Sequence, residues 1–298
     1  MDIAIMIEGQ NGLNWTRWQR LVPLIEDLGF AGLYRSDHFT NANPPDHDSL
    51  ELWVSLTWLA ANTRRLEFGP LVTPFSFRHP ALTARMATAV DDLSGGRLTL
   101  GLGAGWQQRE HTHYGFDLLS LRGRFDRFEE GLEVMRLLMR GDAPATFTGT
   151  YFRLREAVLL PRPQRPGGPP ILIGGNGLTR TLPLAARYAD HWNGMFAPPA
   201  RFAHLNARLT RLLRARDRDP HTVRRSLMTG CFFGRTDAET RQRMGARKAE
   251  DLRARGVVMG TPADVREQLA RFAEAGVERI MLQWLDLDGL EALARAVL

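Results

Sequence analysis

A histidine and an aspartate stand together at the end of one apolar, strand-like segment. Asp37 and His38 directly follow residues 32–36. The imidazole of histidine titrates close to neutral pH, so a histidine next to a carboxylate at a strand end can hold or exchange a proton. A lone histidine is often structural, but the position at a strand end favours catalysis. The pair therefore predicts proton chemistry at His38.

A glycine-rich loop follows another strand-like segment. Gly174, Gly175, Asn176 and Gly177 come after the apolar residues 171–173 and open directly onto a helical pattern. Backbone amides at the N-terminus of a helix, together with the helix dipole, bind anions such as phosphate. A tight turn between strand and helix is the alternative interpretation. The loop is a candidate phosphate site.

A third candidate lies in residues 98–106, where glycines alternate with leucines. One side of this predicted strand carries leucines, and the other carries small residues, namely Thr99, Gly101, Gly103 and Gly105. Glycine within a strand usually means that something approaches the backbone closely. The approaching group is either a bulky neighbouring residue or a flat ligand that lies against the bare face. Because Trp106 follows, the run is not the glycine fingerprint of dinucleotide-binding folds.

Regular alternation of strands and helices positions these residues. Strand-like segments are predicted at residues 3–7, 32–36, 66–71, 98–103, 171–174, 191–195, 226–233 and 279–284. Amphipathic helices are predicted between and after them, at residues 15–28, 50–62, 80–93, 179–188, 201–216, 237–255, 262–275 and 287–298. Strands that are each followed by a helix predict an α/β fold, the (β/α)8 TIM barrel. Such a barrel routinely forms one domain of this size, so residues 1–298 are expected to be a single domain.

The spacing is broken between the fourth and fifth strands, where an insertion is expected. It contains a predicted helix at residues 124–140, a segment at 147–154 that can form a small hairpin, and a proline-rich stretch at 161–170. A long excursion on the catalytic side of a barrel usually shapes the pocket. Packing around the outside of the barrel is the alternative, and both interpretations stay open.

Composition narrows the function classes. The chain has 298 residues, a net charge of +6, and hydrophobic and charged fractions of 44% and 24%, which is ordinary for a globular enzyme. No apolar run has the length of a membrane span, and the chain begins without a basic leader. We therefore expect a cytoplasmic protein with no membrane partner.

Other site chemistries find less support in the residues. Residues 201–218 are rich in arginine but lack interleaved aromatic side chains for base stacking, so we interpret them as a solvated helix face and expect no nucleic-acid partner. Histidines are present, but no carboxylate cluster accompanies them at a strand end, so no metal site is expected. The single cysteine, Cys231, allows neither a disulfide nor a thiolate cluster.

Five motifs, taken in order, resemble the bacterial-luciferase-like oxidoreductases, particularly the branch that uses the deazaflavin coenzyme F420. They are Ser36-Asp37-His38-Phe39, Arg78-His79-Pro80, residues 91–106 with Glu110, residues 170–177, and Ala189-Asp190-His191-Trp192-Asn193. The motifs extend to Asn193, and the helix–strand pattern beyond fits the same barrel.

The resemblance implies a coenzyme ring at the carboxyl-terminal mouth of the barrel, with its phosphate near residues 174–177. It implies that His38 lies beside the ring and assists hydride transfer, as an acid or base or by stabilising charge on the coenzyme. The bare glycine face would leave room for the ring, and a non-proline cis peptide is implied between Leu71 and Val72. The residues implied to bind the coenzyme are Asp37, Leu71, Val72, Thr73, Gly103, Gly105, Trp106, Glu110, Gly174, Gly175, Asn176 and Gly177.

The leading expectation is an F420-dependent oxidoreductase that transfers a hydride between the deazaflavin and a small organic substrate. By resemblance it is expected to be a homodimer. The alternatives are an FMN-dependent luciferase-like monooxygenase that uses reduced flavin and oxygen, a non-catalytic flavin-binding barrel, and behind these a metal hydrolase. Lysines that bind phosphate in some relatives have no evident counterpart here, so arginines or backbone amides are expected to serve instead.

Overall fold

A parallel sheet runs through the computed structural model, which describes residues 1–284, 286 and 288–298. The strands are β1 (Asp2–Ile7), β2 (Gly32–Arg35), β3 (Glu67–Pro70), β4 (Thr73–Pro74), β5 (Leu100–Gly103), β6 (Ala145–Thr148), β7 (Arg153–Ala157), β8 (Ile171–Gly174), β9 (His191–Met195), β10 (Arg224–Phe233), β11 (Val258–Gly260) and β12 (Arg279–Gln283). Among the described residues, ten strands form one sheet in the order β3-β2-β1-β12-β10-β9-β8-β5-β4, with β11 paired to β10. Every predicted strand is present.

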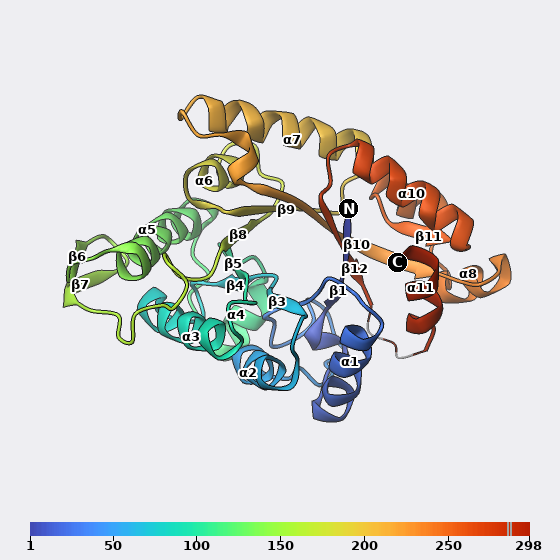
Figure 1. The fold of residues 1–298 in the computed structure, drawn as a ribbon, viewed down its shortest axis with the longest axis horizontal. Coiled ribbons are helices and arrows are strands. Elements are labelled where there is room, and N and C mark those ends of the chain that lie inside the picture. Colours follow the sequence, from blue (N-terminus) through green and yellow to red (C-terminus); the bar gives the residue numbers. More distant parts are fainter. Residues whose placement is uncertain (285, 287) are drawn as a thin grey trace. The chain divides into compact units, whose positions relative to one another are not determined.

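Helices separate most of these strands along the sequence (Figure 1). They are α1 (Trp15–Asp27), α2 (Leu52–Asn62), α3 (Pro80–Leu93), α4 (Gln108–Tyr114), α5 (Leu121–Arg140), α6 (Thr181–Tyr188), α7 (Pro199–Arg214), α8 (Asp237–Met244), α9 (Ala249–Ala254), α10 (Pro262–Glu274) and α11 (Leu290–Val297). Helix α3 has the predicted bounds because His79 caps it: its Nδ1 accepts the N–H of Ala81 at 3.2 Å, and Pro80 occupies the first turn.

Two regions differ from the predicted helices by more than their ends. The single helix predicted at residues 237–255 is wrong, because the chain breaks into α8 and α9 at Gly245, whose φ of +59° does not fit a right-handed helix. Helix α4 was not predicted, because its polar residues resemble a loop. Gly115, with φ +74°, ends α4 after two histidines in the last turn, and this stop signal could have indicated it. The predicted start of the last helix, Leu287, lies outside the described residues.

The chain divides into two compact units. Unit 1 comprises Met1–Glu8, Thr16–Tyr34 and Ile173–Leu298. In this unit β1, β12, β10 and β9 pair in parallel, with Ile5 opposite Leu282 on β12. These strands are buried along most of their length, as is typical of parallel strands covered on both faces. Helix α6 packs on α7, and α10 packs on α11 (Figure 1).

Unit 2 comprises Gly9–Trp15 and Arg35–Leu172. Strand β4 pairs in parallel with β5, and α3 packs against both α2 and α5. The hairpin expected at residues 147–154 is present as the antiparallel pair of β6 and β7. Both interpretations of the insertion, shaping the pocket and packing around the outside of the barrel, stay predictions, as does the single domain over residues 1–298.

The side of β5 that carries Gly101 and Gly103 is covered by Pro70 and Val72 of the same chain. A Cβ atom on Gly101 would lie 2.0 Å from the carbonyl oxygen of Pro70, and one on Gly103 would lie 2.5 Å from Cγ2 of Val72. Protein interiors are close-packed, so no larger residue fits at either position without displacing its neighbour. This face is therefore not bare, and the alternative of a close neighbour holds at Gly101 and Gly103. Contact of Gly103 and Gly105 with a coenzyme stays a prediction.

Candidate active site

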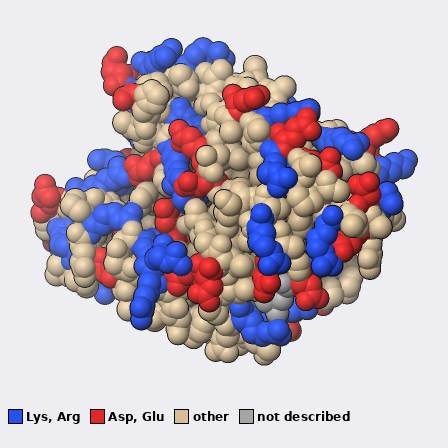
Figure 2. Space-filling model, turned by 45° about the vertical axis from the view of Figure 1, so that its right-hand side comes forward, with Lys and Arg blue, Asp and Glu red and all other residues tan. Residues whose placement is uncertain are grey.

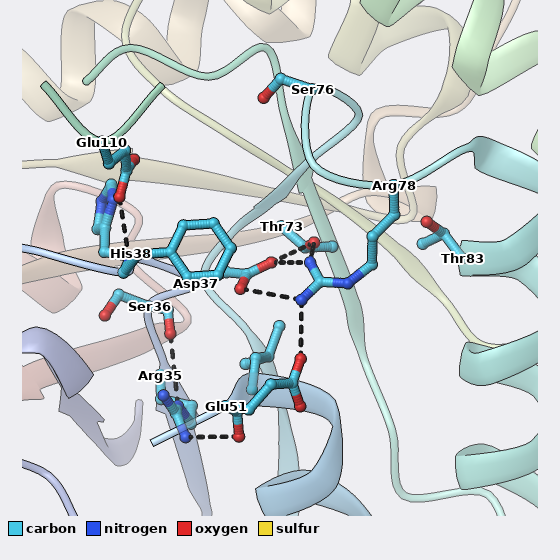
Figure 3. Close-up of polar contacts among 12 residues, drawn as sticks. Arg35, Ser36, Asp37, His38, Glu51, Thr73, Ser76, Arg78, Thr83 and Glu110 are labelled. Atoms are coloured by element: carbon cyan, nitrogen blue, oxygen red, sulfur yellow. Dashed lines mark hydrogen bonds and ion pairs between the residues drawn. The ribbon is translucent and has the colours of Figure 1, made fainter. Parts of the chain in front are cut away.

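The carboxylate of Glu110 holds the imidazole of His38. His38 follows β2, and Glu110 lies in the first turn of α4 (Figure 3). His38 Nδ1 is 2.8 Å from Glu110 Oε1, while Glu110 Oε2 accepts the backbone N–H of Phe39 at 3.0 Å. Glu110 is 1% exposed. One buried carboxylate therefore fixes both the histidine ring and the backbone that follows it.

This contact determines the tautomer of His38. A carboxylate oxygen accepts hydrogen bonds, so Nδ1 of His38 carries the proton and Nε2 is the nitrogen whose protonation changes. The arrangement of imidazole and buried carboxylate is the one by which a carboxylate orients a catalytic base and stabilises its protonated form. The site can therefore take up or release a proton at Nε2.

Asp37 has different partners from those expected. Its Oδ2 accepts the hydroxyl of Thr73 at 2.6 Å and Nη1 of Arg78 at 2.5 Å, and Nη2 of Arg78 reaches Glu51 at 2.8 Å (Figure 3). Burial alone would lower the pKa of Arg78, but the charges of Asp37 and Glu51 raise it. Arg78 and Thr73 engage the carboxylate of Asp37, so the neighbour of His38 in the sequence is not its partner in the structure. Coenzyme binding by Asp37 stays a prediction.

A second arginine, Arg35, supports the end of β2. Arg35 is 1% exposed and donates to the hydroxyl of Ser55 at 2.6 Å and the carbonyl of Leu50 at 2.5 Å. Burial lowers the pKa of its guanidinium to about 10, and the charges of Asp37 and Glu51 oppose this. Sequence reasoning gave no role to Arg35, Glu51 or Arg78, although Arg78 belongs to one of the motifs used for the resemblance.

Helix α4 is anchored by its first histidine, His111. His111 Nδ1 is 2.7 Å from the carbonyl of Gln107, and its Nε2 is 2.8 Å from the hydroxyl of Ser76. Because a carbonyl only accepts, Nδ1 carries the proton and the serine donates to Nε2 of the neutral ring. Burial lowers the pKa of His111, which favours this neutral form, although the hydrogen bond to Gln107 opposes the shift.

Aromatic packing fixes the outer side of the same helix. The ring of Phe39 stacks on Phe116 with a centroid distance of 5.7 Å and lies 4.8 Å from Tyr114 and 4.7 Å from Phe77. Such pairs contribute about 0.5–1.5 kcal/mol each beyond their buried area. The segment after β2 and helix α4 are therefore joined by side-chain packing as well as by Glu110.

Trp106 is an exposed aromatic side chain beside His38. Its ring meets the imidazole edge to face at a centroid distance of 5.5 Å, and it is 61% exposed. Gly105, which precedes it, has φ +83°, and a Cβ there would lie 3.2 Å from Oγ of Ser76. The loop after β5 thus needs glycine at residue 105 to present Trp106.

The chain segment between β3 and β4 contains the expected cis bond. The peptide between Leu71 and Val72 is cis, which confirms the expectation. Thr73 follows and donates to Asp37, and Leu71 N–H donates to the carbonyl of Arg35 at 2.7 Å. These residues therefore support the end of β2, and their contact with a coenzyme stays a prediction.

The glycine loop at residues 174–177 belongs to unit 1. The N–H of Gly175 donates to the carbonyl of Asn193 at 2.9 Å. The side chain of Asn176 pairs with the backbone of Met195: its Oδ1 accepts the N–H at 3.0 Å, and its Nδ2 donates to the carbonyl at 2.6 Å. Asn176 therefore fixes the shape of the loop, and the amide of Gly175 is engaged by the protein itself.

The loop does not open directly onto a helix, as the sequence had suggested. Helix α6 begins at Thr181, and the residues between form a turn. A Cβ on Gly177 would lie 2.8 Å from the hydroxyl of Thr181, so glycine is needed there for close packing. Phosphate binding by residues 174–177 stays a prediction.

The described residues hold no metal cluster and no membrane-spanning helix. Within residues 1–284, 286 and 288–298, no group of three or more His, Cys, Asp or Glu side chains is placed to hold a metal ion. No helix in that part of the chain is long and apolar enough to cross a membrane. Basic and acidic side chains intermingle on the face drawn in Figure 2.

Comparison with known proteins identifies the family. The family model described as luciferase-like monooxygenase matches residues 1–254. A protein of Mycobacterium tuberculosis named F420-dependent hydroxymycolic acid dehydrogenase is 30% identical over 262 residues, which cover 87% of this chain and 69% of that one. The 4-hydroxyprotoasukamycin monooxygenase of Streptomyces nodosus subsp. asukaensis is 32% identical over 63% of this chain and 49% of its own length. The chain thus spans about half the length of several relatives that it matches.

A solved structure shows the same fold. An F420-dependent secondary alcohol dehydrogenase, in complex with an F420-acetone adduct, superposes with a TM-score of 0.87 at 19% identity over 99% of this chain and 98% of that one. The predicted (β/α)8 TIM barrel is confirmed. With the family match over most of its length, the chain belongs to the luciferase-like monooxygenase family and is an oxidoreductase.

Proposed function

We propose that this protein is an F420-dependent oxidoreductase that transfers a hydride between the deazaflavin and a small organic substrate. The observation that carries the proposal is the buried carboxylate of Glu110 on Nδ1 of His38, at the end of a barrel strand. Relatives with F420-dependent dehydrogenase activity in their names support it. When bound, the coenzyme supplies the ring carbon that accepts or gives the hydride.

Residues of the chain fit such a coenzyme. In unit 2, Trp106 presents an exposed indole beside the catalytic histidine. In unit 1, Gly175 has φ +126° and Gly177 leaves no space for a Cβ, so backbone lines this part of the loop. Because the amide of Gly175 donates to Asn193, the amides of Asn176 and Gly177 would be the donors to a phosphate group. We therefore keep residues 174–177 as the proposed phosphate site.

His38 performs the proton transfer that hydride transfer requires. Oxidation of an alcohol removes a hydride from carbon and a proton from oxygen, and reduction of a carbonyl adds both. In the first direction Nε2 of His38 accepts the hydroxyl proton while Glu110 holds Nδ1–H and stabilises the cation. Asp37, held by Arg78 and Thr73, fixes the strand end and moves no proton.

Coenzyme titration and turnover test the proposal. We expect the purified protein to bind F420 more tightly than FMN. When alcohols are supplied, the visible absorbance of F420 should bleach. Failure to bind F420, or F420 binding with no turnover across a panel of primary and secondary alcohols, aldehydes and ketones, would contradict it.

An FMN-dependent monooxygenase is the second candidate. The similarity to 4-hydroxyprotoasukamycin monooxygenase favours it. This function requires reduced flavin and consumes oxygen, whereas hydride transfer with F420 consumes none. An oxygen electrode, with reduced FMN supplied and F420 absent, therefore separates the two candidates.

The proposed enzyme is a cytoplasmic homodimer. Helix α2 is apolar on most of its surface, and Val54 on it is 57% exposed, while Leu82 on the neighbouring α3 is 50% exposed. Exposed apolar patches on adjacent helices commonly mark protein interfaces. A second copy of the chain would cover this surface.

A further inference from the structure

Two arginines in the first turns of α5 lie beside the loop that carries Trp106. Arg124 Nη1 donates to the carbonyl of Gly105 at 3.2 Å, and Arg127 Nη1 donates to the carbonyl of Asp117 at 2.8 Å. Being three residues apart on a helix, the two side chains share one face of α5. Trp106 follows Gly105 directly and contacts His38, so the arginines adjoin the proposed active site within unit 2.

Both guanidinium groups bury an N–H that has no acceptor. Nε of Arg124 and Nη2 of Arg127 are buried without a hydrogen-bond partner, and Arg127 is only 9% exposed. Within the part of the chain that the structure describes, neither arginine forms an ion pair. A buried charge is normally paired, and a buried donor without an acceptor costs about 1–3 kcal/mol.

The electrostatics of the pair also call for an anion. Burial lowers the pKa of Arg127, Asp117 and Tyr151 oppose this, and repulsion from Arg124 adds to it. At His111 the charge of Glu110 raises the pKa, whereas those of Arg127 and His38 lower it. Arg124 and Arg127 therefore lie close enough to repel each other, and the charge of Asp117 acts against this repulsion at Arg127.

We propose that Arg124 and Arg127 form a subsite for an anionic group, a carboxylate or a phosphate, carried by a molecule that binds beside Trp106. A guanidinium presents paired N–H donors in a plane, which suits the oxygens of either group. The two buried N–H groups without acceptors would then gain partners. Only the source of the anion rests on the proposed function. Because residues 174–177 are the proposed site for the phosphate of the coenzyme, we favour a substrate with an acid group as the source of the anion.

Titration with inorganic phosphate tests the subsite on the protein alone. We expect calorimetry to detect phosphate binding to the wild type, and the variants Arg124→Gln and Arg127→Gln each to weaken it at least about tenfold, the effect of losing one charge-assisted contact. Glutamine can still donate to the carbonyls of Gly105 and Asp117. The matched control is Arg122→Gln on the same helix, since Arg122 is 89% exposed and should leave the affinity unchanged.

Nitrogen NMR of the wild type gives a reading that does not depend on the variants folding. Phosphate should shift the Nε–H resonances of Arg124 and Arg127 and leave that of Arg122 in place. Absence of phosphate binding to the wild type, or equal affinity in all variants, would overturn the subsite.

Competition then identifies the source of the anion. Phosphate that raises the KM of an acidic substrate without changing F420 affinity supports the substrate. Phosphate that displaces F420 supports an anionic group of the coenzyme and overturns the assignment to the substrate. Because phosphate binding needs neither coenzyme nor turnover, failure of the proposed function leaves the test of the subsite intact.

Discussion

His38 receives its partner from a residue 72 positions later in the sequence. If His38 is the proton-transfer group, His38→Ala should lower the turnover number by about 10²–10⁴-fold, the usual contribution of general acid–base catalysis. The Kd for F420 should change much less. The measurement is steady-state kinetics beside fluorescence titration of the coenzyme. An unchanged turnover number would remove His38 from the mechanism.

The pair of Asp37 and Arg78 should be important for stability. Asp37 is 5% exposed, so Arg78→Gln leaves a buried carboxylate without its cation and should lower the free energy of unfolding by about 3–5 kcal/mol. The double variant Asp37→Asn with Arg78→Gln should recover part of this loss. Urea denaturation gives both values. A loss below about 1 kcal/mol in the single variant would show that the pair contributes little.

The sequence identified the residues of this site better than their partners. Strand ends and motifs can be recognised from the sequence alone. They therefore singled out four residues of the site: Asp37, His38, Thr73 and Glu110. The pairing was not visible: Asp37 adjoins His38 in the sequence yet bonds to Arg78, and Glu110 takes its place at the imidazole. Partner choice depends on where α4 and the segment after β4 bring their side chains, and this is set by tertiary packing.

At the level of elements, the buried histidine of α4 should make stability depend on pH. The pKa of His111 lies below its ordinary 6.5, so the unfolded chain binds this proton more readily than the folded one. The contribution is complete above the unfolded pKa and is lost as pH falls from there through the lower, folded pKa. Between about pH 7 and pH 5, the free energy of unfolding of the wild type should therefore fall more steeply than that of His111→Gln. Parallel curves in urea denaturation would refute this.

A double variant can test the packing of β5 against the segment between β3 and β4. Gly103→Ala should destabilise the protein by about 1–3 kcal/mol, because the added Cβ meets Val72. Val72→Ala removes the obstructing methyl groups, so the double variant should show a favourable coupling energy. Gly69→Ala is the matched control: its Cβ would lie 1.9 Å from the carbonyl oxygen of Thr99, which Val72→Ala leaves in place. Strictly additive effects at residue 103 would contradict the packing described for this face.

At the level of the molecule, the alternation of strands and helices was sufficient to predict the barrel. Hydrophobic periodicity located the strands, and capping and turn residues located the bounds of α3, since these features depend on local sequence. They failed at Gly245, where a positive φ breaks a helical pattern, and at α4, whose residues are polar because they serve the site. For the glycine face the sequence left a neighbouring residue and a ligand as alternatives, because the segment that covers the face, at Pro70 and Val72, lies about 30 residues away.

The proposed homodimer is open to a direct test. The wild type should sediment at about twice 33.6 kDa, and Val54→Arg should shift the protein toward the monomer. Val158→Arg is a suitable control, because Val158 is 42% exposed and lies outside α2 and α3. A wild type that sediments as a monomer would exclude the dimer.

The bond between Glu110 and His38 has a consequence for the energetic cost of the reaction. With neutral imidazole the two side chains carry one negative charge, and after proton uptake they carry none. In the proposed oxidation, proton uptake would therefore leave a neutral ion pair, where a lone imidazole would leave an uncompensated cation. Because the negative charge of Glu110 is in place before the proton arrives, no unpaired cation forms at His38.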